Sequence, residues 1–330
     1  MSDMQGIVVH EYGPPEDLRI ETRPMPEPGP DQVRVRVEAA GVGFVDALMV
    51  QGLYQIKPPT PWAPGMEFAG TVDACGADVA DLKVGDPVCG TAGGALAEYL
   101  VASHAACAAI PTGLSMVEAA GFWTNHATAL LGFWNCANLQ AGETVLILGA
   151  AGGVGSSAIS VAKAMGAHVI AAASTDEKLA YCTAAGADET INYADPEWRN
   201  ELKRRYPQGI DVAYDPVGGP FTELALRSMA PGGRLLIVGF ANGEIPAPRL
   251  NLALLKRCSI VGVNWGGEIA ANPEVETQIS SRLVQMVNDG MRPAPVTTWP
   301  LSEAPAALRA MLDRRATGKV VIVPDPDGAQ

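Results

Sequence analysis

Residues 145–155 constrain the fold of this chain more than any other stretch. They read V-L-I-L-G-A-A-G-G-V-G, an apolar run that passes directly into a glycine-rich turn. A continuous apolar run is typical of a strand buried on both faces of a sheet. The composition of residues 156–165 predicts a helix that ends at Gly166. This order predicts a dinucleotide-binding loop, because glycines let the backbone approach a pyrophosphate and the helix N-terminus offers unpaired N–H groups. The predicted loop residues are Gly149, Ala151, Gly152, Gly153, Val154 and Gly155.

Length and composition limit the class of protein. The chain has 330 residues, of which 48% are hydrophobic and 18% charged, as expected for two globular domains. Its net charge of −13 argues against nucleic acid or an anionic membrane as a partner. We find no membrane span, no leader segment and no C-x-x-C pair among the six cysteines. These features predict a cytoplasmic protein with reduced thiols.

Two patterns follow one another along the chain. Residues 1–120 are rich in short strands and turns; in 33–38, for example, valines alternate with charged residues, which predicts a half-buried strand. From 121 to 263 strands alternate with helices, which implies a doubly wound parallel sheet and an α/β fold. The further strands expected there are 168–173, 189–193, 210–215, 234–240 and 259–263. Helices are expected over 176–185, 274–288 and 303–314, and strands over 296–299 and 319–323.

Several segments together resemble a known family. They are G-V-G-F-V-D-A-L-M-V-Q-G-L-Y (41–54), P-G-M-E-F-A-G-T-V (64–72), the glycine loop, S-T-D-E-K (174–178), D-P-V-G-G (215–219) and V-G-F-A-N-G (238–243). In this order they resemble the zinc-independent medium-chain dehydrogenases/reductases of the quinone oxidoreductase type. The resemblance implies a discontinuous GroES-like catalytic domain, a Rossmann domain and a homodimer paired through Rossmann edge strands. The expected division is 1–122 for the catalytic domain, 123–263 for the Rossmann domain, and 264–330 for a segment that returns to the catalytic domain.

The end of the second Rossmann strand bears on the choice of cofactor. An Asp or Glu at this place commonly binds the ribose hydroxyls of NAD, but here the strand ends A-A-A-S without a carboxylate. Ser174 and Thr175 offer hydroxyls, and the resemblance implies that Lys178 and Tyr193 bind a 2′-phosphate. The alternatives are a solvated helix residue for Lys178 and an ordinary strand-end aromatic for Tyr193. We therefore expect NADPH rather than NADH.

A metal is not expected. The zinc-dependent relatives use an early Cys and a G-H-E segment, whereas the matching places here are 41–46, without Cys, and Gly65-Met66-Glu67. A thioether is a poor zinc ligand beside imidazole or thiolate. Without a metal Lewis acid, reduction of an electrophilic acceptor is favoured over oxidation of an alcohol.

The resemblance also implies candidates around the nicotinamide and the substrate. The cofactor candidates are Thr124, Asn125, Thr128, Phe240, Asn242, Asn264, Trp265 and, as a phosphate ligand near the C-terminus, Lys319. The substrate-lining candidates are Phe44, Asp46 and Tyr54. Tyr54 and His126 are candidate proton donors. The alternatives are a packed tyrosine, a histidine that packs or bonds to phosphate, a locally hydrogen-bonded Asp46, and a Trp265 at a dimer contact or in the core.

These features are compatible with three functions. The leading hypothesis is an NADPH-dependent reductase that transfers hydride to a quinone, a small-molecule electron acceptor. Its enzymatic rival is reduction of the C=C bond of α,β-unsaturated carbonyls, either free enones or thioesters. The third is a non-catalytic NADPH-binding protein, as lens crystallins of this family illustrate.

Overall fold

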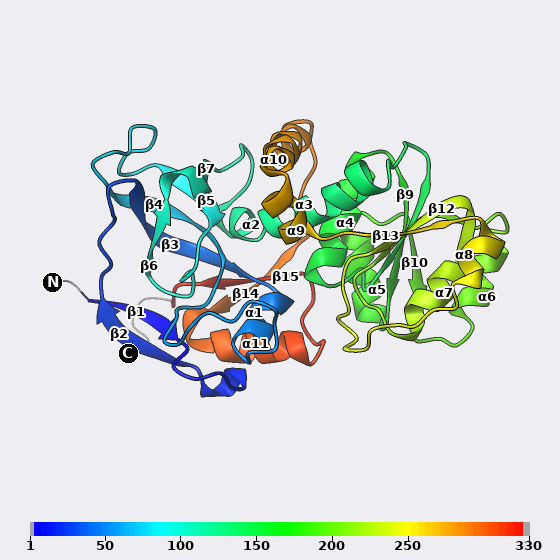
Figure 1. The fold of residues 1–330 in the computed structure, drawn as a ribbon, viewed down its shortest axis with the longest axis horizontal. Helices are drawn as coiled ribbons and strands as arrows, with labels where there is room; N and C mark the ends of the chain where they lie inside the picture. Colours follow the sequence, from blue (N-terminus) through cyan, green and yellow to red (C-terminus); the bar gives the residue numbers. More distant parts are fainter. Residues whose placement is uncertain (1–2, 326–330) are drawn as a thin grey trace. The chain divides into compact units, whose positions relative to one another are not determined.

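The computed structural model describes residues 3–325. Contacts divide the chain into a first unit, 1–123 with 296–330, and a second unit, 124–295 (Figure 1). The segment that returns to the first unit therefore begins at Val296, whereas the sequence placed this boundary at 264. Residues 1–2 and 326–330, which belong to the expected catalytic domain and returning segment, lie outside the described part.

The first unit is built mainly from antiparallel strands. A seven-stranded sheet has the order β14-β15-β3-β4-β5-β7, with β6 paired to β3, and β1 and β2 form a separate hairpin. Only β14 and β15 run parallel among these pairs. The strands are β1 (Asp3–Val8), β2 (Arg19–Pro24), β3 (Gln32–Val42), β4 (Glu67–Cys75), β5 (Pro87–Thr91), β6 (Tyr99–Ser103), β7 (Cys107–Ala109), β14 (Val296–Pro300) and β15 (Lys319–Val323). The helices are η1 (Pro15–Asp17), α1 (Phe44–Met49), η2 (His104–Ala106), α2 (Met116–Ala120), η4 (Leu301–Glu303) and α11 (Ala304–Leu312).

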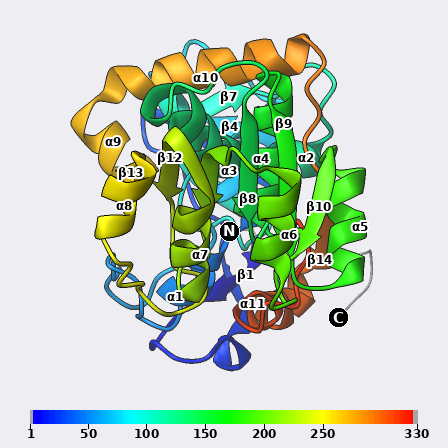
Figure 2. The ribbon, with the colours of Figure 1, turned by 90° about the vertical axis from the view of Figure 1, so that its right-hand side faces the viewer.

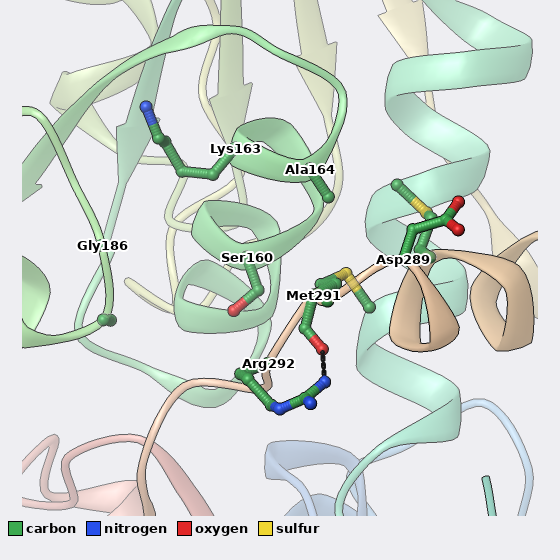
Figure 3. Close-up of a pocket in the computed structure, with 10 residues that line it drawn as sticks. Ser160, Lys163, Ala164, Gly186, Asp289, Met291 and Arg292 are labelled. Atoms are coloured by element: carbon green, nitrogen blue, oxygen red, sulfur yellow. Dashed lines mark hydrogen bonds between the residues drawn. The ribbon is translucent and has the colours of Figure 1, made fainter. Parts of the chain in front are cut away.

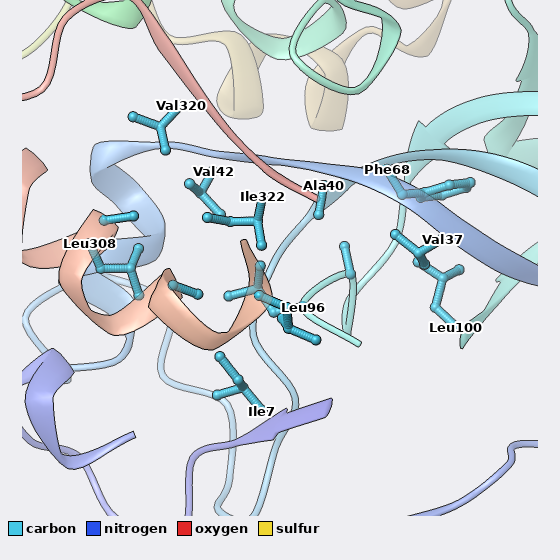
Figure 4. Packing of buried hydrophobic residues seen from close by; sticks show 14 of the residues in the cluster. Ile7, Val37, Ala40, Val42, Phe68, Leu96, Leu100, Leu308, Val320 and Ile322 are labelled. Atoms are coloured by element: carbon cyan, nitrogen blue, oxygen red, sulfur yellow. The ribbon is translucent and has the colours of Figure 1, made fainter. Parts of the chain in front are cut away.

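The alternation of valines in β3 produces the core of the first unit. Val33, Val35 and Val37 are buried, while the charged residues between them are partly or fully exposed. The apolar face packs against side chains from distant parts of the chain, among them Leu308 of α11 and Ile322 of β15 (Figure 4). Burial of this face holds the returning C-terminal segment to the N-terminal strands.

The second unit is a parallel sheet with helices on both faces (Figures 1 and 2). Its strand order is β10-β9-β8-β11-β12-β13, the order expected of a Rossmann fold. The strands are β8 (Thr144–Leu148), β9 (His168–Ala173), β10 (Glu189–Asn192), β11 (Ile210–Asp215), β12 (Met229–Ile237) and β13 (Ser259–Gly262). The helices are α3 (Trp123–Leu130), η3 (Leu131–Cys136, a π-helix), α4 (Gly153–Ala164), α5 (Asp176–Ala184), α6 (Trp198–Arg205), α7 (Pro220–Ser228), α8 (Asn251–Lys256), α9 (Trp265–Ala271) and α10 (Pro273–Asn288).

The α/β fold class is thus confirmed, while some boundaries differ. The fifth Rossmann strand begins at Met229 rather than at 234 and ends at Ile237, so Phe240 lies in the loop that follows it. The first Rossmann helix begins at Gly153, inside the glycine run. All six cysteines are free. In the described part of the chain, no helix has the length and apolar character needed to cross a bilayer.

Candidate cofactor and substrate sites

The glycine loop has the geometry that a pyrophosphate requires. Gly149 follows β8 with φ +58°, a conformation that favours glycine, and the extended Gly152 caps α4. A Cβ on Gly155 would lie 2.4 Å from the carbonyl oxygen of Gly149, so only glycine fits there. The first turn of α4 contains no acidic residue. An anion at this N-terminus would meet the N–H groups of the first turn and no carboxylate from that turn.

The ends of β9 and β10 stand side by side. The Tyr193 amide donates to the Ala173 carbonyl at 3.0 Å. Because Ala173 immediately precedes Ser174, Tyr193 lies close to the start of the segment 174–178. Thr175 caps α5, and its hydroxyl accepts the Lys178 amide at 3.3 Å. The Tyr193 ring packs on Phe221 with centroids 4.6 Å apart. The structure therefore brings all four predicted phosphate-binding residues to one edge of the sheet.

The candidates after β12 and β13 lie at the same edge, because carboxyl ends of parallel strands share it. The amide of Asn242 donates to the Val217 carbonyl at 2.8 Å, so the loop after β12 packs along the loop after β11. Asn264 caps α9 by accepting the Gly267 amide at 3.1 Å, and Trp265, which begins α9, is half-buried. Phe240 is 39% exposed, enough for its ring to contact a ligand.

The candidate residues of helix α3 differ in their burial. Asn125 and His126 are buried, and the Thr128 hydroxyl donates to the Thr124 carbonyl at 2.7 Å. Burial of His126 fits its alternative role as a packing residue as well as it fits proton donation.

The substrate candidates of the first unit lie in and after α1. The Asp46 carboxylate accepts the Gly43 amide at 2.7 Å, so this side chain caps the helix. Its burial raises the pKa of Asp46 to about 6. Phe44 begins α1 and Tyr54 follows it, both half-buried. Within residues 3–325, the Tyr54 hydroxyl makes no hydrogen bond, which leaves it able to donate one to a substrate.

Lys319 lies in the interior of the first unit. Its ammonium donates to the Glu67 carboxylate, and both side chains are buried. The Glu67 carboxylate therefore competes with a cofactor phosphate for the Lys319 ammonium. The sequence contained Glu67 in its G-M-E triplet, but no local signal paired it with a lysine so far along the chain.

Asp215 is a second residue that sequence reasoning missed. Its carboxylate accepts the Val217 and Gly218 amides at 2.9 Å each and the Thr222 hydroxyl at 2.6 Å. It thereby shapes the D-P-V-G-G loop beside the glycine turn: a Cβ on Gly149 would lie 2.7 Å from the Val217 side chain. The sequence signal was the motif itself, to which no role had been given.

Among the residues that the structure describes, no three His, Cys, Asp or Glu side chains gather so that they could hold a metal ion. A cavity of about 390 Å³ lies beside the C-terminal half of α4, away from the glycine loop (Figure 3). The cations that line it are engaged: Lys163 bonds Asp188 at 2.7 Å, and Arg292 bonds the Met291 carbonyl at 2.9 Å. We assign no ligand to it.

Comparisons with known proteins agree with this architecture. The family "Alcohol dehydrogenase GroES-like domain" matches residues 29–112, and "Zinc-binding dehydrogenase" matches residues 153–282. Quinone oxidoreductase-like protein 2 of Rattus norvegicus is 37% identical over 298 residues, 89% of this chain and 85% of that protein.

Solved structures extend the similarity to the whole fold. Escherichia coli quinone oxidoreductase complexed with NADPH has a TM-score of 0.84 and 27% identity, covering 97% of this chain and 100% of that chain. CurK enoyl reductase has a TM-score of 0.86 and 28% identity, covering 98% of this chain and 100% of that chain. The GroES-like unit and the Rossmann unit with its glycine loop define an oxidoreductase of two domains. The chain belongs to the medium-chain dehydrogenase/reductase superfamily, among proteins similar to quinone oxidoreductases.

Proposed function

We propose that this protein is an NADPH-dependent reductase that transfers hydride to a quinone without zinc. The observation that carries the proposal is the edge formed by Ser174, Thr175, Lys178 and Tyr193. It offers hydroxyls and an ammonium at the end of β9 and no carboxylate at the strand end itself. These groups favour binding of the 2′-phosphate of NADPH, whereas an acidic residue at this place favours the free ribose hydroxyls of NADH. The NADPH complex of the E. coli quinone oxidoreductase supports the same cofactor.

Bound NADPH would supply the hydride, and the protein would position the acceptor and stabilise the charge that develops on it. We assign the pyrophosphate to the glycine loop and the N-terminus of α4. The side chains after β12 and β13, with Thr124, Asn125 and Thr128, are proposed to contact the nicotinamide half. Phe44 and Tyr54 are proposed to line the acceptor, with the unbonded Tyr54 hydroxyl as hydrogen-bond donor to a carbonyl.

Zinc independence is part of the proposal. Met66 stands where the zinc-dependent relatives have His, and the neighbouring Glu67 carboxylate is paired with Lys319. A thioether and an already paired carboxylate make a poor ligand set for Zn²⁺.

Reduction of an enone or enoyl thioester is the second candidate function, supported by the similarity to an enoyl reductase. Saturation of a C=C bond needs a proton as well as a hydride, and Tyr54 and His126 are the proposed donors. A non-catalytic NADPH-binding protein is the candidate of another class, since the glycine loop serves it equally well.

We also propose a homodimer paired through β13. Among the described strands, β13 pairs with β12 only, so its other edge is open. Ile260 of this strand and Leu250, Leu254 and Leu255 around α8 are exposed. An open strand edge beside an apolar patch is a surface that a second copy can cover.

Initial rates of NADPH and NADH oxidation, with a simple quinone and a simple enone side by side, test the function. We expect fast turnover of the quinone with NADPH and much slower turnover with NADH. Turnover of the enone alone would move the assignment to C=C reduction. Tight NADPH binding without turnover of either would support the binding protein. Comparable kcat/KM for the two cofactors would contradict the assignment of the phosphate edge.

A further inference from the structure

Three charged side chains form a buried cluster in the first unit. Asp46 of α1, Glu67 of β4 and Lys319 of β15 are 7%, 6% and 5% exposed. We call them the charge cluster. Burying a charge costs free energy unless an opposite charge or hydrogen bonds compensate it. The Lys319 ammonium is paired with Glu67, and its charge also acts on Asp46.

Strand register explains how Lys319 reaches this position. In β3, Gly41 pairs with Glu67 of β4 on one side, while Val42 pairs with Val320 of β15 on the other. Lys319 precedes Val320 in the chain, so it begins β15 next to the end of β3. A Cβ on Gly41 would lie 3.1 Å from Lys319 Cε, so the lysine side chain runs across this glycine to Glu67.

Asp46 connects the charge cluster to the predicted substrate segment. Its carboxylate accepts the Gly43 amide at 2.7 Å and so fixes the first turn of α1, which contains Phe44 and precedes Tyr54. Burial raises the pKa of Asp46 to about 6; Lys319 opposes this rise and Glu67 adds to it. Helix α11 also packs on α1, but its Arg309 is held by Glu16.

We propose that Lys319 is a positioning residue, which keeps Asp46 ionised so that the Asp46 carboxylate holds the Gly43 amide and orients residues 43–54 for the acceptor. The inference rests on the proposed function for the role of that segment. A proton on Asp46 Oδ weakens the acceptor for the Gly43 amide, because bonds to an ionised oxygen are the stronger ones. In this assignment Lys319 contributes nothing to the cofactor phosphate, which is left to Lys178.

The kinetic test compares Lys319→Met with Lys319→Arg. In Lys319→Met the acid limb of kcat/KM for the acceptor should move up by about one pH unit, since an opposite charge nearby shifts a carboxyl pKa by this amount or more. We expect a higher acceptor KM, an unchanged NADPH Kd and recovery of the wild-type profile in Lys319→Arg. In Asp46→Asn, kcat/KM for the acceptor should no longer fall at acid pH within the range from pH 5 to 8. A fivefold or greater loss of NADPH affinity with NADH affinity intact would overturn the proposal in favour of a phosphate contact.

A second readout needs no turnover, so it separates failure of this inference from failure of the proposed function. Because the folded state binds the Asp46 proton more tightly than the unfolded state, thermal stability should fall as pH rises from about 4 to 6. Lys319→Met should extend that fall to higher pH, and Asp46→Asn should remove it. The exposed Lys83→Met serves as control and should follow wild type. Melting curves of wild type and Asp46→Asn with the same pH dependence would contradict the inference even if Lys319→Met does not fold.

Discussion

Gly155 faces the carbonyl oxygen of Gly149 so closely that a Cβ on Gly155 would lie 2.4 Å from that oxygen. The same carbonyl accepts the Gly152 amide at 3.0 Å. The two contacts fold the loop tightly against the first turn of α4. The glycines therefore define one turn conformation, and the N–H groups of α4 are oriented by it.

The substitution Gly155→Ala should disrupt this turn. The added methyl group must displace backbone, which we expect to cost about 1–3 kcal/mol of stability. Because the first N–H groups of α4 move with the turn, the NADPH Kd should rise about tenfold or more. Titration by cofactor fluorescence measures it. Gly93→Ala, whose Cβ would meet nothing within 4 Å, is the matched control and should bind NADPH as wild type does.

Lys178→Ala should discriminate between the two nicotinamide cofactors. Loss of a charge-assisted hydrogen bond to the 2′-phosphate should raise the NADPH Kd about tenfold and leave the NADH Kd unchanged. Isothermal titration with both cofactors checks this. Lys163→Ala is the control, because Asp188 already engages that ammonium at 2.7 Å. An equal loss for both cofactors would mean that Lys178 contacts another part of the dinucleotide.

Arg234→Met should destabilise the second unit in a pH-dependent manner. The guanidinium donates to both Glu143 oxygens, at 2.9 and 2.7 Å, and to the Ala137 carbonyl at 2.9 Å. At pH 7 we expect the free energy of unfolding to fall by about 2 kcal/mol.

The sign of that pH dependence follows from Glu143. Hydrogen bonds from Arg234 hold the pKa of Glu143 below its ordinary value of 4.5. The stabilisation is therefore complete above pH 4.5 and is lost as pH falls through the lowered pKa. Urea unfolding at pH 7, 5 and 4 should show the gap between wild type and variant narrowing. Arg205→Met removes ion pairs with Glu201 and Glu189, whose side chains are more exposed than those of Arg234 and Glu143. It should cost less than about 1 kcal/mol, and a loss as large as that of Arg234→Met would contradict this expectation.

Leu254→Glu should convert the proposed dimer to a monomer. Leu254 is 77% exposed on α8, so in a monomer a charge there is solvated, whereas in a dimer through β13 it is buried against the partner. Light scattering after size exclusion should give half the wild-type mass. Val84→Glu, also exposed but in the first unit, should leave the mass unchanged. A wild-type protein that already runs as a monomer would remove the dimer proposal.

Much of the second unit could be predicted from the sequence. The strand residues 145–148 form an apolar run that is fully buried, and β9 and β11 begin and end where the pattern placed them, as does β15 of the first unit. Helices such as α1, α8 and the π-helix η3 were not predicted. They are six residues long each, too short for a helical period to emerge, and their packing against neighbouring elements determines them.

The site divides in the same way. The position of Ser174, Thr175 and Tyr193 after strand ends could be predicted, because parallel strands bring their carboxyl ends to one edge. The phosphate-binding role of Lys178 and Tyr193 was implied by the family resemblance and stays a prediction. Lys319 was assigned to the cofactor from its local segment, and Asp215 received no role. The partner of Lys319 is Glu67, which is distant in sequence. Asp215 instead accepts amides of the turn that its own side chain shapes.

The sequence by itself determined the fold class and the chemistry of the cofactor loop, since buried strands and glycine turns leave periodic and local patterns. Only the tertiary structure decided where the charges of the first unit go. Lys319 meets Glu67 across 252 residues of sequence, and Asp46 lies against the same β3 end. The physical reason is strand register: β3 pairs with β4 on one side and β15 on the other, and that pairing brings the Lys319 ammonium to the Glu67 carboxylate.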